Sequence, residues 1–205
     1  MEYYIYNIPV FLVDEPGKDV DIPGFCTEVE DYLSPELLTN VEVVYIGNFK
    51  ELKDRNAAYS NGGIYMTNME PTNFDMIENF VHEVAHSLEA EYGAEIYTED
   101  LLKEFQRKRA RLQQLLTAAG YHIDPLLYSF TEYNEKFDNF LAHEVGYPVL
   151  LNMTMGLFVS PYGATSLQEY FANGFEKYFL DNPEFVRKVS PVLYRKIEEI
   201  AHPQT

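Results

Sequence analysis

The chain has 205 residues, of which 46% are hydrophobic and 23% charged, a composition typical of one globular domain with a sizeable core. Fifteen Lys and Arg stand against 33 Asp and Glu, and the formal net charge is −18 at pH 7. Nucleic acids and anionic membrane surfaces are bound through basic surfaces, so this charge argues against both as the main partner. A neutral or basic substrate fits the charge better.

The compartment is indicated by three absences in the sequence. Cys26 is the only cysteine, so no intramolecular disulfide can form. Residues 1–5 lack the basic region and cleavage site of a secretory signal. The longest apolar stretch, about residues 147–162, is interrupted by Gly156 and Pro161 and is too short to span a bilayer. We expect a protein that is cytoplasmic as made, and delivery elsewhere by another route is compatible with the sequence.

The first third of the chain predicts strands and short helices. Tyr3–Val13 and Val41–Ile46 are rich in aromatic and β-branched residues, as strands are. Between them, Thr27–Leu38 predicts one or two short helices interrupted at Ser34-Pro35. Asn61-Gly62 lies between two strand-like runs and predicts a hairpin, because a type I′ turn needs positive φ at both central positions.

From residue 74 onward the pattern is helical. Strands followed by helices indicate an α+β fold, and we expect one domain over residues 1–205. Its N-terminal lobe, about 1–93, would hold a small mixed sheet and its C-terminal lobe, about 94–205, would be mainly helical, with a cleft between them. The expected helices are Phe74–Tyr92 ended by Gly93, a Thr98-capped helix to about Ala119, Glu132–Leu141, Ser166–Leu180, and Pro183–Ile200 in two pieces split near Pro191.

His82-Glu83-Val84-Ala85-His86 is an H-E-x-x-H sequence. On a helix, residues four apart differ by only roughly 40° around the axis, so both imidazoles can bind one metal ion. Glu83 lies roughly 100° away, where it can act on water beside the metal instead of binding the metal itself.

The surrounding residues support this interpretation. A helical wheel places the apolar residues on the arc opposite to both histidines, so the helix has a complete core face without them. The members of that face are Phe74, Ile77, Phe80, Val81, Val84, Ala85 and Leu88. Two histidines on a solvated surface remain the alternative, which explains neither the spacing nor Glu83.

A catalytic zinc needs a third protein ligand and one open position. The extended metzincin motif requires Gly at position 89 and His at position 92, whereas this chain has Glu89 and Tyr92, which excludes that class. His122, His143 and His202 are possible ligands without a supporting pattern. Glu169 lies on the polar face of the helix over 166–180 and is a better candidate, although the residues alone also allow an ordinary solvated carboxylate.

A family resemblance distinguishes these alternatives. His82–His86, followed after a long helical insertion by Tyr162-Gly163-Ala164-Thr165-Ser166-Leu167-Gln168-Glu169-Tyr170-Phe171-Ala172, resembles the catalytic domain of the anthrax lethal-factor-like zinc metallopeptidases and the related Pro-Pro endopeptidases. Those gluzincins carry an H-E-x-x-H helix and a later Y-x(6)-E-[FY]-[FY]-A segment. The resemblance covers about residues 35–180, and its specific motifs lie at these two places.

The resemblance implies a zincin-like fold and a zinc-dependent endopeptidase with one Zn²⁺ per chain. It implies that His82, His86 and Glu169 bind zinc, that Glu83 is the general base, and that Tyr162 donates a hydrogen bond to the developing oxyanion. The partner would be a peptide or protein substrate, and neither nucleic acid nor membrane. The oligomeric state does not follow from the sequence.

Two rival functions are compatible with the same residues. One is a catalytically inactive zinc-binding structural or interaction protein of the same fold. The other is a deformylase-like enzyme that uses Cys26 as a ligand, although Cys26 lacks the surrounding motif of that family, and a buried free thiol is its ordinary role.

Two further segments have two interpretations each. Ile64–Met66 is either an edge strand that could pair with an extended substrate or a paired internal strand. The basic cluster Arg107-Lys108-Arg109-Arg111 is interleaved with leucines, and we expect it to be the solvated face of an amphipathic helix and not a nucleic-acid patch.

Overall fold

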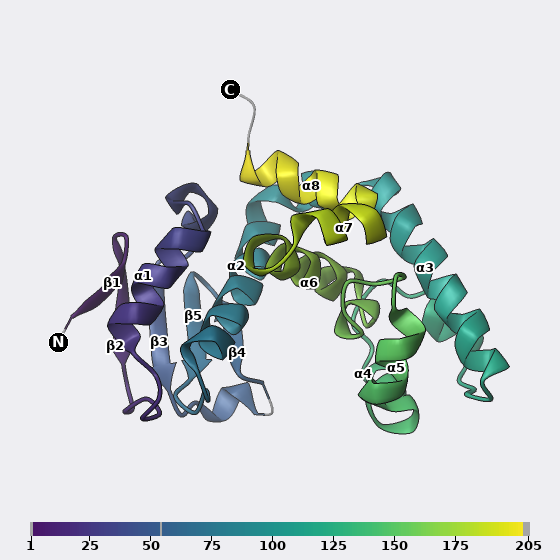
Figure 1. Ribbon diagram of the computed structural model, residues 1–205, viewed down its shortest axis with the longest axis horizontal. Helices are drawn as coiled ribbons and strands as arrows, with labels where there is room; N and C mark the ends of the chain where they lie inside the picture. The colour runs from purple at the N-terminus through teal and green to yellow at the C-terminus, as the bar shows by residue number, and fades with distance from the viewer. Residues whose placement is uncertain (1, 54, 203–205) are drawn as a thin grey trace. The chain divides into compact units, whose positions relative to one another are not determined.

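The computed structural model describes residues 2–53 and 55–202; residues 1, 54 and 203–205 lie outside this description. The chain divides into two compact units, residues 1–91 and 92–205. A five-stranded mixed sheet with helices forms the first unit and the second is mainly helical, which confirms the α+β prediction (Figure 1). Among the described residues, no helix has the length and apolar character needed to cross a membrane.

The sheet has parallel strands at its centre and antiparallel strands at its edges. Its order is β1-β2-β3-β5-β4, with β2, β3 and β5 parallel and with β1 and β4 antiparallel to their neighbours. The strands are β1 (Tyr3–Ile5), β2 (Ile8–Leu12), β3 (Val43–Gly47), β4 (Ala57–Ser60) and β5 (Gly63–Thr67).

The predicted hairpin at Asn61-Gly62 is confirmed. It joins β4 to β5, and both turn residues have positive φ, 47° at Asn61 and 81° at Gly62. Because β5 pairs with β3 on one side and β4 on the other, the edge-strand alternative for Ile64–Met66 is wrong. The edge strand at this end of the sheet is β4.

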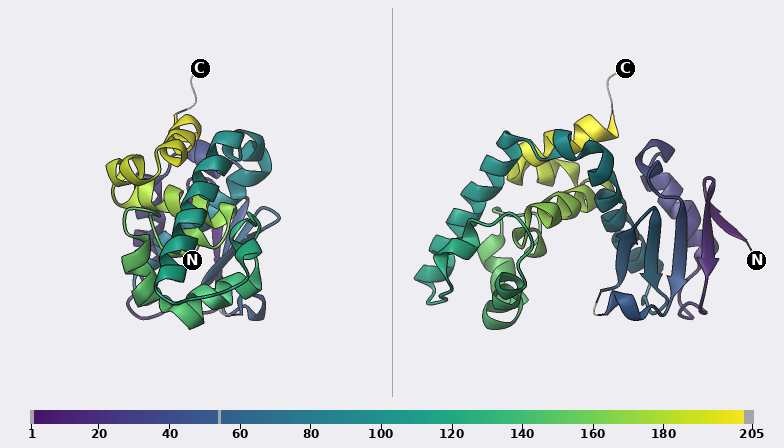
Figure 2. Two further views of the ribbon diagram at one scale, coloured as in Figure 1. Left: turned by 90° about the vertical axis from the view of Figure 1, so that its right-hand side faces the viewer. Right: turned by 180° about the vertical axis from the view of Figure 1, so that it is seen from behind.

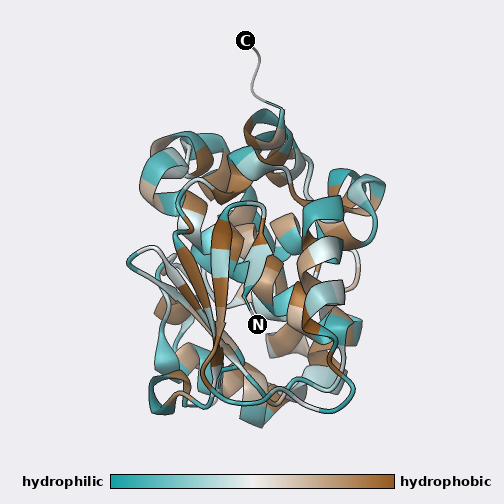
Figure 3. Cartoon of the chain, turned by 90° about the vertical axis from the view of Figure 1, so that its left-hand side faces the viewer, coloured by the Kyte–Doolittle hydropathy of each residue, from teal (hydrophilic) through white to brown (hydrophobic). Residues whose placement is uncertain are grey.

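One face of the sheet is covered by α1 (Ile22–Tyr32) and by the part of α2 (Asn73–Ile96) that belongs to the first unit (Figures 1 and 2). Alternate strand residues form the core on this face, and Figure 3 shows hydrophobic stretches along the strands. The least exposed of these residues are Ile5, Val44, Ile46, Ile64 and Met66, each 0% exposed. Short 3₁₀ segments lie at η1 (Pro35–Leu38) and η2 (Lys50–Leu52).

Helix α2 differs from its prediction at both ends. It continues through Gly93 to Ile96, so Gly93 does not end it. At the other end Phe74 is 46% exposed and does not belong to the core face. The rest of the predicted face is confirmed, since Ile77, Phe80 and Leu88 are each 0% exposed.

The second unit is built on α3 (Glu99–Ala118), which begins after Thr98 as predicted. The break near Pro191 between the last two helices is also confirmed. The predicted helix over 132–141 is different: the short helix α4 (Glu135–Asn139) passes into a seven-residue π-helix, η4 (Phe140–Gly146), which ends at Gly146 with φ 84°. The further elements are η3 (Pro125–Tyr128), α5 (Tyr147–Thr154), η5 (Tyr162–Ala164), α6 (Leu167–Leu180), α7 (Pro183–Val189) and α8 (Pro191–Ala201).

The prediction of a wholly solvated basic face on α3 is wrong. Arg107 and Arg111 are exposed, but Lys108 is 8% exposed and Arg109 is 1% exposed. Both buried cations donate several hydrogen bonds to backbone carbonyls, and these bonds compensate for lost hydration.

Candidate metal centre

Helix α2 presents the H-E-x-x-H residues on its partly exposed side. Its core face is fully buried, as the 0% exposure of Phe80, Val84 and Leu88 shows. His82 and His86 are only partly buried, so the core does not account for them. The helix is therefore fixed by its apolar side, and its opposite side holds the two imidazoles.

The two imidazoles are arranged as two ligands of one metal ion would be. Their Nε2 atoms are 3.2 Å apart, and their ring centroids are 5.0 Å apart. Two donors that each lie about 2.1 Å from a tetrahedral zinc are about 3.4 Å from each other. The spacing of His82 and His86 on α2 thus fits a shared metal ion.

Glu89 orients one of these rings. The Nδ1 atom of His86 donates to Oε1 of Glu89 across 2.7 Å, and both residues are partly buried. A proton held on Nδ1 leaves the lone pair on Nε2, which is the atom that faces His82. The carboxylate of Glu89 therefore fixes the tautomer that a metal ligand needs.

Glu83 lies against the free edge of the sheet. Its Oε2 accepts a hydrogen bond of 2.7 Å from the backbone N–H of Tyr59 in β4. In an antiparallel pair the N–H groups point alternately toward and away from the neighbouring strand, and that of Tyr59 points away from β5. This bond holds the Glu83 carboxylate beside the outer edge of β4.

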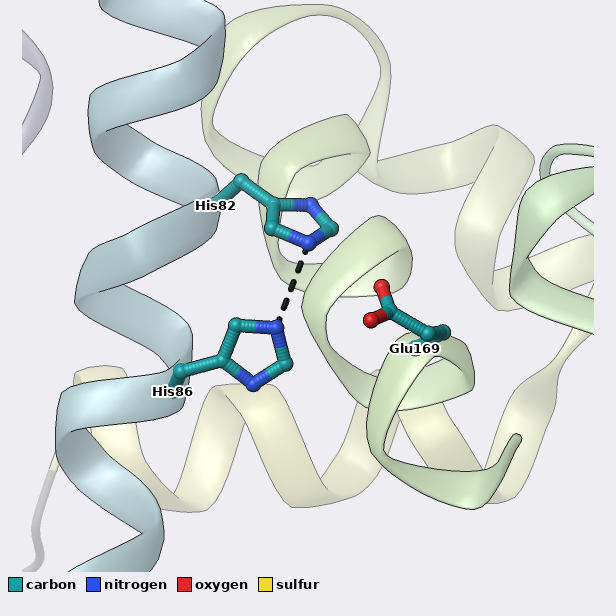
Figure 4. A group of neighbouring side chains, drawn as sticks. All are labelled: His82, His86 and Glu169. Atoms are coloured by element: carbon teal, nitrogen blue, oxygen red, sulfur yellow. Dashed lines mark hydrogen bonds between the residues drawn. The ribbon is translucent and has the colours of Figure 1, made fainter. Parts of the chain in front are cut away.

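Glu169 lies in the first turn of α6. Ser166 caps that helix, because its Oγ accepts from the N–H of Glu169 across 3.1 Å, and Asn173 Nδ2 donates to the Glu169 carbonyl across 2.9 Å. One ligand atom from each of His82, His86 and Glu169 lies within 4.8 Å of the others, so the three form a cluster that could hold a metal ion (Figure 4).

Tyr162 begins η5, directly before α6. Thr165 closes this short turn, since both its N–H and its hydroxyl donate to the carbonyl of Tyr162, across 2.9 and 2.8 Å. Ser160 holds the same turn from the other side, because its Oγ accepts from Gly163 N–H and donates to Asn173 Oδ1. Tyr162 and Glu169 are thereby attached to one compact piece of backbone.

The other candidate ligands are not brought into this cluster. Within residues 2–53 and 55–202, the three clustered residues are the one group of His, Cys, Asp and Glu close enough to share a metal. His143 is exposed on η4, and Cys26 is buried in α1, where burial raises the pKa of its thiol to about 11. Neither His122 nor His202 is a member.

Two contacts of this centre were not foreseen from the sequence. Glu89 lies three residues after His86, and this i, i+3 spacing on a helix was a usable signal. The bond from Tyr59 to Glu83 uses a backbone N–H, which every residue except proline carries, so no sequence pattern could indicate it.

No protein-family model, no curated protein and no solved structure matches this chain.

Proposed function

We propose that the protein is a zinc-dependent endopeptidase with a zincin-like fold of the lethal-factor-like kind. The observation that carries the proposal is the cluster of His82, His86 and Glu169 on two helices. Two neutral imidazoles and one carboxylate form a donor set typical of catalytic zinc, with a fourth position left for water or substrate. The 3.2 Å between the two Nε2 atoms supports the same metal.

Zinc, when bound, supplies a Lewis acid for the activation of water and of the peptide carbonyl. The remaining chemistry belongs to the chain itself. Glu83 accepts a proton from the attacking water and returns it to the leaving amine, and the N–H of Tyr59 keeps its carboxylate in place. Tyr162 donates a hydrogen bond to the substrate oxygen as negative charge develops on it.

The substrate that suits this site is an extended peptide of neutral or basic character. Apart from the N–H of Tyr59, which already donates to Glu83, the outer edge of β4 offers backbone groups that an added strand can bind. The net charge of −18 favours the approach of a basic peptide, and steering of this kind weakens as ionic strength rises.

Metal analysis and one pair of variants test the proposal. The purified protein should hold close to one zinc per chain, His82→Ala should lose it, and Glu83→Gln should keep zinc while losing peptide hydrolysis. A protein that binds no zinc would refute the proposal, and so would hydrolysis unchanged in Glu83→Gln. Zinc bound at these residues without any hydrolysis by the unaltered protein would instead favour the inactive structural or interaction protein.

A further inference from the structure

Arg109 is the least exposed charged residue of the second unit and takes no part in the proposed hydrolysis. It lies on α3 and is 1% exposed. Its guanidinium lies over the rings of Phe137 and Phe105, 4.0 and 5.4 Å from their centroids. Burial lowers the pKa of Arg109 to about 10, so the group stays charged at neutral pH.

The hydrogen bonds of this guanidinium are directed at backbone carbonyls. Nη1 donates to the carbonyls of Ala164 and Thr165, across 2.6 and 3.0 Å, and Nη2 donates to the carbonyl of Leu127 across 2.6 Å. A planar guanidinium has fixed donor directions, so two bonds to consecutive carbonyls define the path of that backbone.

The two carbonyls of Ala164 and Thr165 lie between Tyr162 and Glu169 in the chain. Thr165 returns two hydrogen bonds to Tyr162, and the next residue, Ser166, caps the helix that begins with Glu169 in its first turn. Arg109 therefore holds the one stretch of backbone that carries both the proposed oxyanion donor and the proposed third ligand.

We propose that Arg109 is a positioning residue of the metal centre, acting through the backbone of Ala164 and Thr165 on Tyr162 and Glu169. The inference rests on the proposed function. A buried cation without a carboxylate partner is costly, and an apolar residue would fill the same place in the core at lower cost. The bonds to the carbonyls of Ala164 and Thr165 explain why a buried cation is kept here, because they hold the backbone that positions Glu169. A metal ligand displaced by a fraction of an ångström binds the metal less well.

The test compares the zinc affinity of Arg109→Met and Arg109→Lys with that of the unaltered protein, by competition with a chromophoric chelator. Lysine keeps the charge but cannot reproduce the planar pair of donors. We expect the dissociation constant for zinc to rise about 10- to 100-fold in both variants, the range found when groups that orient metal ligands are removed.

Lys108→Met is the matched control. Lys108 is the neighbouring buried cation on α3, but its Nζ donates to Leu157, Val189 and Ser190, outside the segment from Tyr162 to Glu169. A role in stability alone predicts similar zinc affinity in the two methionine variants. The positioning role predicts that Arg109→Met and Arg109→Lys, but not Lys108→Met, weaken zinc binding and speed amide exchange at Thr165, Glu169 and Tyr170.

If no variant at position 109 folds, Phe137→Leu allows zinc affinity to be compared with that of the unaltered protein while the guanidinium of Arg109 is kept. It removes the ring beneath Arg109 and should weaken zinc binding in the same direction. Unchanged zinc affinity in the folded variants at 109, or in Phe137→Leu if those do not fold, would overturn the inference. Glu169→Gln separates the two proposals: if it weakens zinc binding while the Arg109 variants do not, the metal site stands and the positioning role fails.

Discussion

Glu89 is the residue that gives His86 its orientation, and its contribution can be measured separately. The carboxylate accepts the Nδ1–H of His86 across 2.7 Å, so the lone pair on Nε2 is available for a metal. In Glu89→Gln an amide replaces the carboxylate, and the ring loses a charged acceptor. We expect zinc affinity to fall about 10- to 100-fold while zinc stoichiometry at saturation stays the same.

The exposed residue Glu95 provides the control for this change, because it lies farther along the same helix. Glu95→Gln alters the net charge of the protein by the same amount without touching either imidazole. Equal losses of zinc affinity in the two variants would mean that overall charge, and not the hydrogen bond to His86, governs metal binding.

Tyr162 is expected to act on the transition state and not on substrate binding. Tyr162→Phe removes one hydroxyl and retains the ring, so kcat should fall about 100- to 1000-fold, as when a single oxyanion donor is lost, while KM changes little. Steady-state kinetics on a peptide substrate give both quantities. Tyr121→Phe, in the loop after α3, should leave both unchanged. A rise in KM at constant kcat in Tyr162→Phe would contradict the assigned role.

At the scale of single residues, the sequence predicts the shared direction of His82 and His86 well, because a four-residue spacing on a helix determines it. Glu169 is different: helical periodicity places it only on a polar face, and the family resemblance was needed to single it out as a ligand. The structure brings its carboxylate into the cluster. The acceptors of Arg109 could not be predicted, since the carbonyls of residues 127, 164 and 165 carry no side-chain signature.

Helices α6 and α8 pack closely because of one glycine. A methyl group at Gly174 would lie 2.9 Å from Cγ of Leu193, which is 0% exposed. Alanine is the better helix former by about 1 kcal/mol, but overpacking a buried contact costs about 1–3 kcal/mol. Gly174→Ala should therefore lower the free energy of unfolding, as chemical denaturation would show.

Gly93 on α2 is the matched position for that experiment. No described heavy atom lies within 4 Å of a methyl group placed there, outside its own helix and its neighbours in the chain. The effect of the substitution on stability should then depend on helix propensity alone, and Gly93→Ala should raise the free energy of unfolding by about 0.5–1 kcal/mol. Opposite signs in the two variants are the expected result. Stabilisation by both would show that α8 moves aside from α6 without cost.

At the scale of elements, the sequence predicted correctly those turns and helix ends that depend on the conformation of a few neighbouring residues. The turn at Asn61-Gly62 and the break near Pro191 follow from backbone conformations that few residues can adopt. The pairing of β5 on both sides depends on strands that meet only in the folded sheet, so the sequence could not choose between edge and interior. The π-helix η4 was not predicted, because no residue pattern along the chain marks i→i+5 hydrogen bonds.

The apolar stripe of α3 indicated that Lys108 and Arg109 are buried, although the sequence prediction placed both in solvent. Leu101, Phe105, Leu112 and Leu116 are all 0% exposed, and a continuous stripe needs members near 108 and 109. Lys108 and Arg109 fill that gap. Charged residues are seldom buried, so the usual rule assigned both to solvent, whereas distant carbonyls supply the partners that make burial tolerable.

For the whole molecule, these two cations have a consequence for stability. The chain carries a net charge of −18, and a negative surrounding potential offsets part of the cost of burying a cation. Burial nevertheless lowers the pKa of Lys108 to about 8, although the nearby Glu104 acts in the opposite direction. The folded protein therefore holds this proton less tightly than the unfolded chain, in which an exposed lysine titrates near its usual value of about 10.4.

The sign of the pH dependence follows from that difference. Below pH 8 both states are protonated and the cost of the buried charge is fully present. As pH rises above about 8, the folded state releases the proton while the unfolded state keeps it until about pH 10.4, so the contribution of Lys108 to stability increases over this window. A difference of this size corresponds to about 3 kcal/mol at most.

Lys108→Met lacks the titrating group and should lack this increase. The free energy of unfolding of the unaltered protein minus that of Lys108→Met should therefore grow between pH 8 and pH 10, as denaturant titrations at several pH values would show. The subtraction removes the opposite effect of Cys26, whose raised thiol pKa lowers stability above about pH 9 in both proteins. A constant difference across this range would show that the Lys108 ammonium keeps its proton in the folded state, held by the carbonyls of Leu157 and Val189.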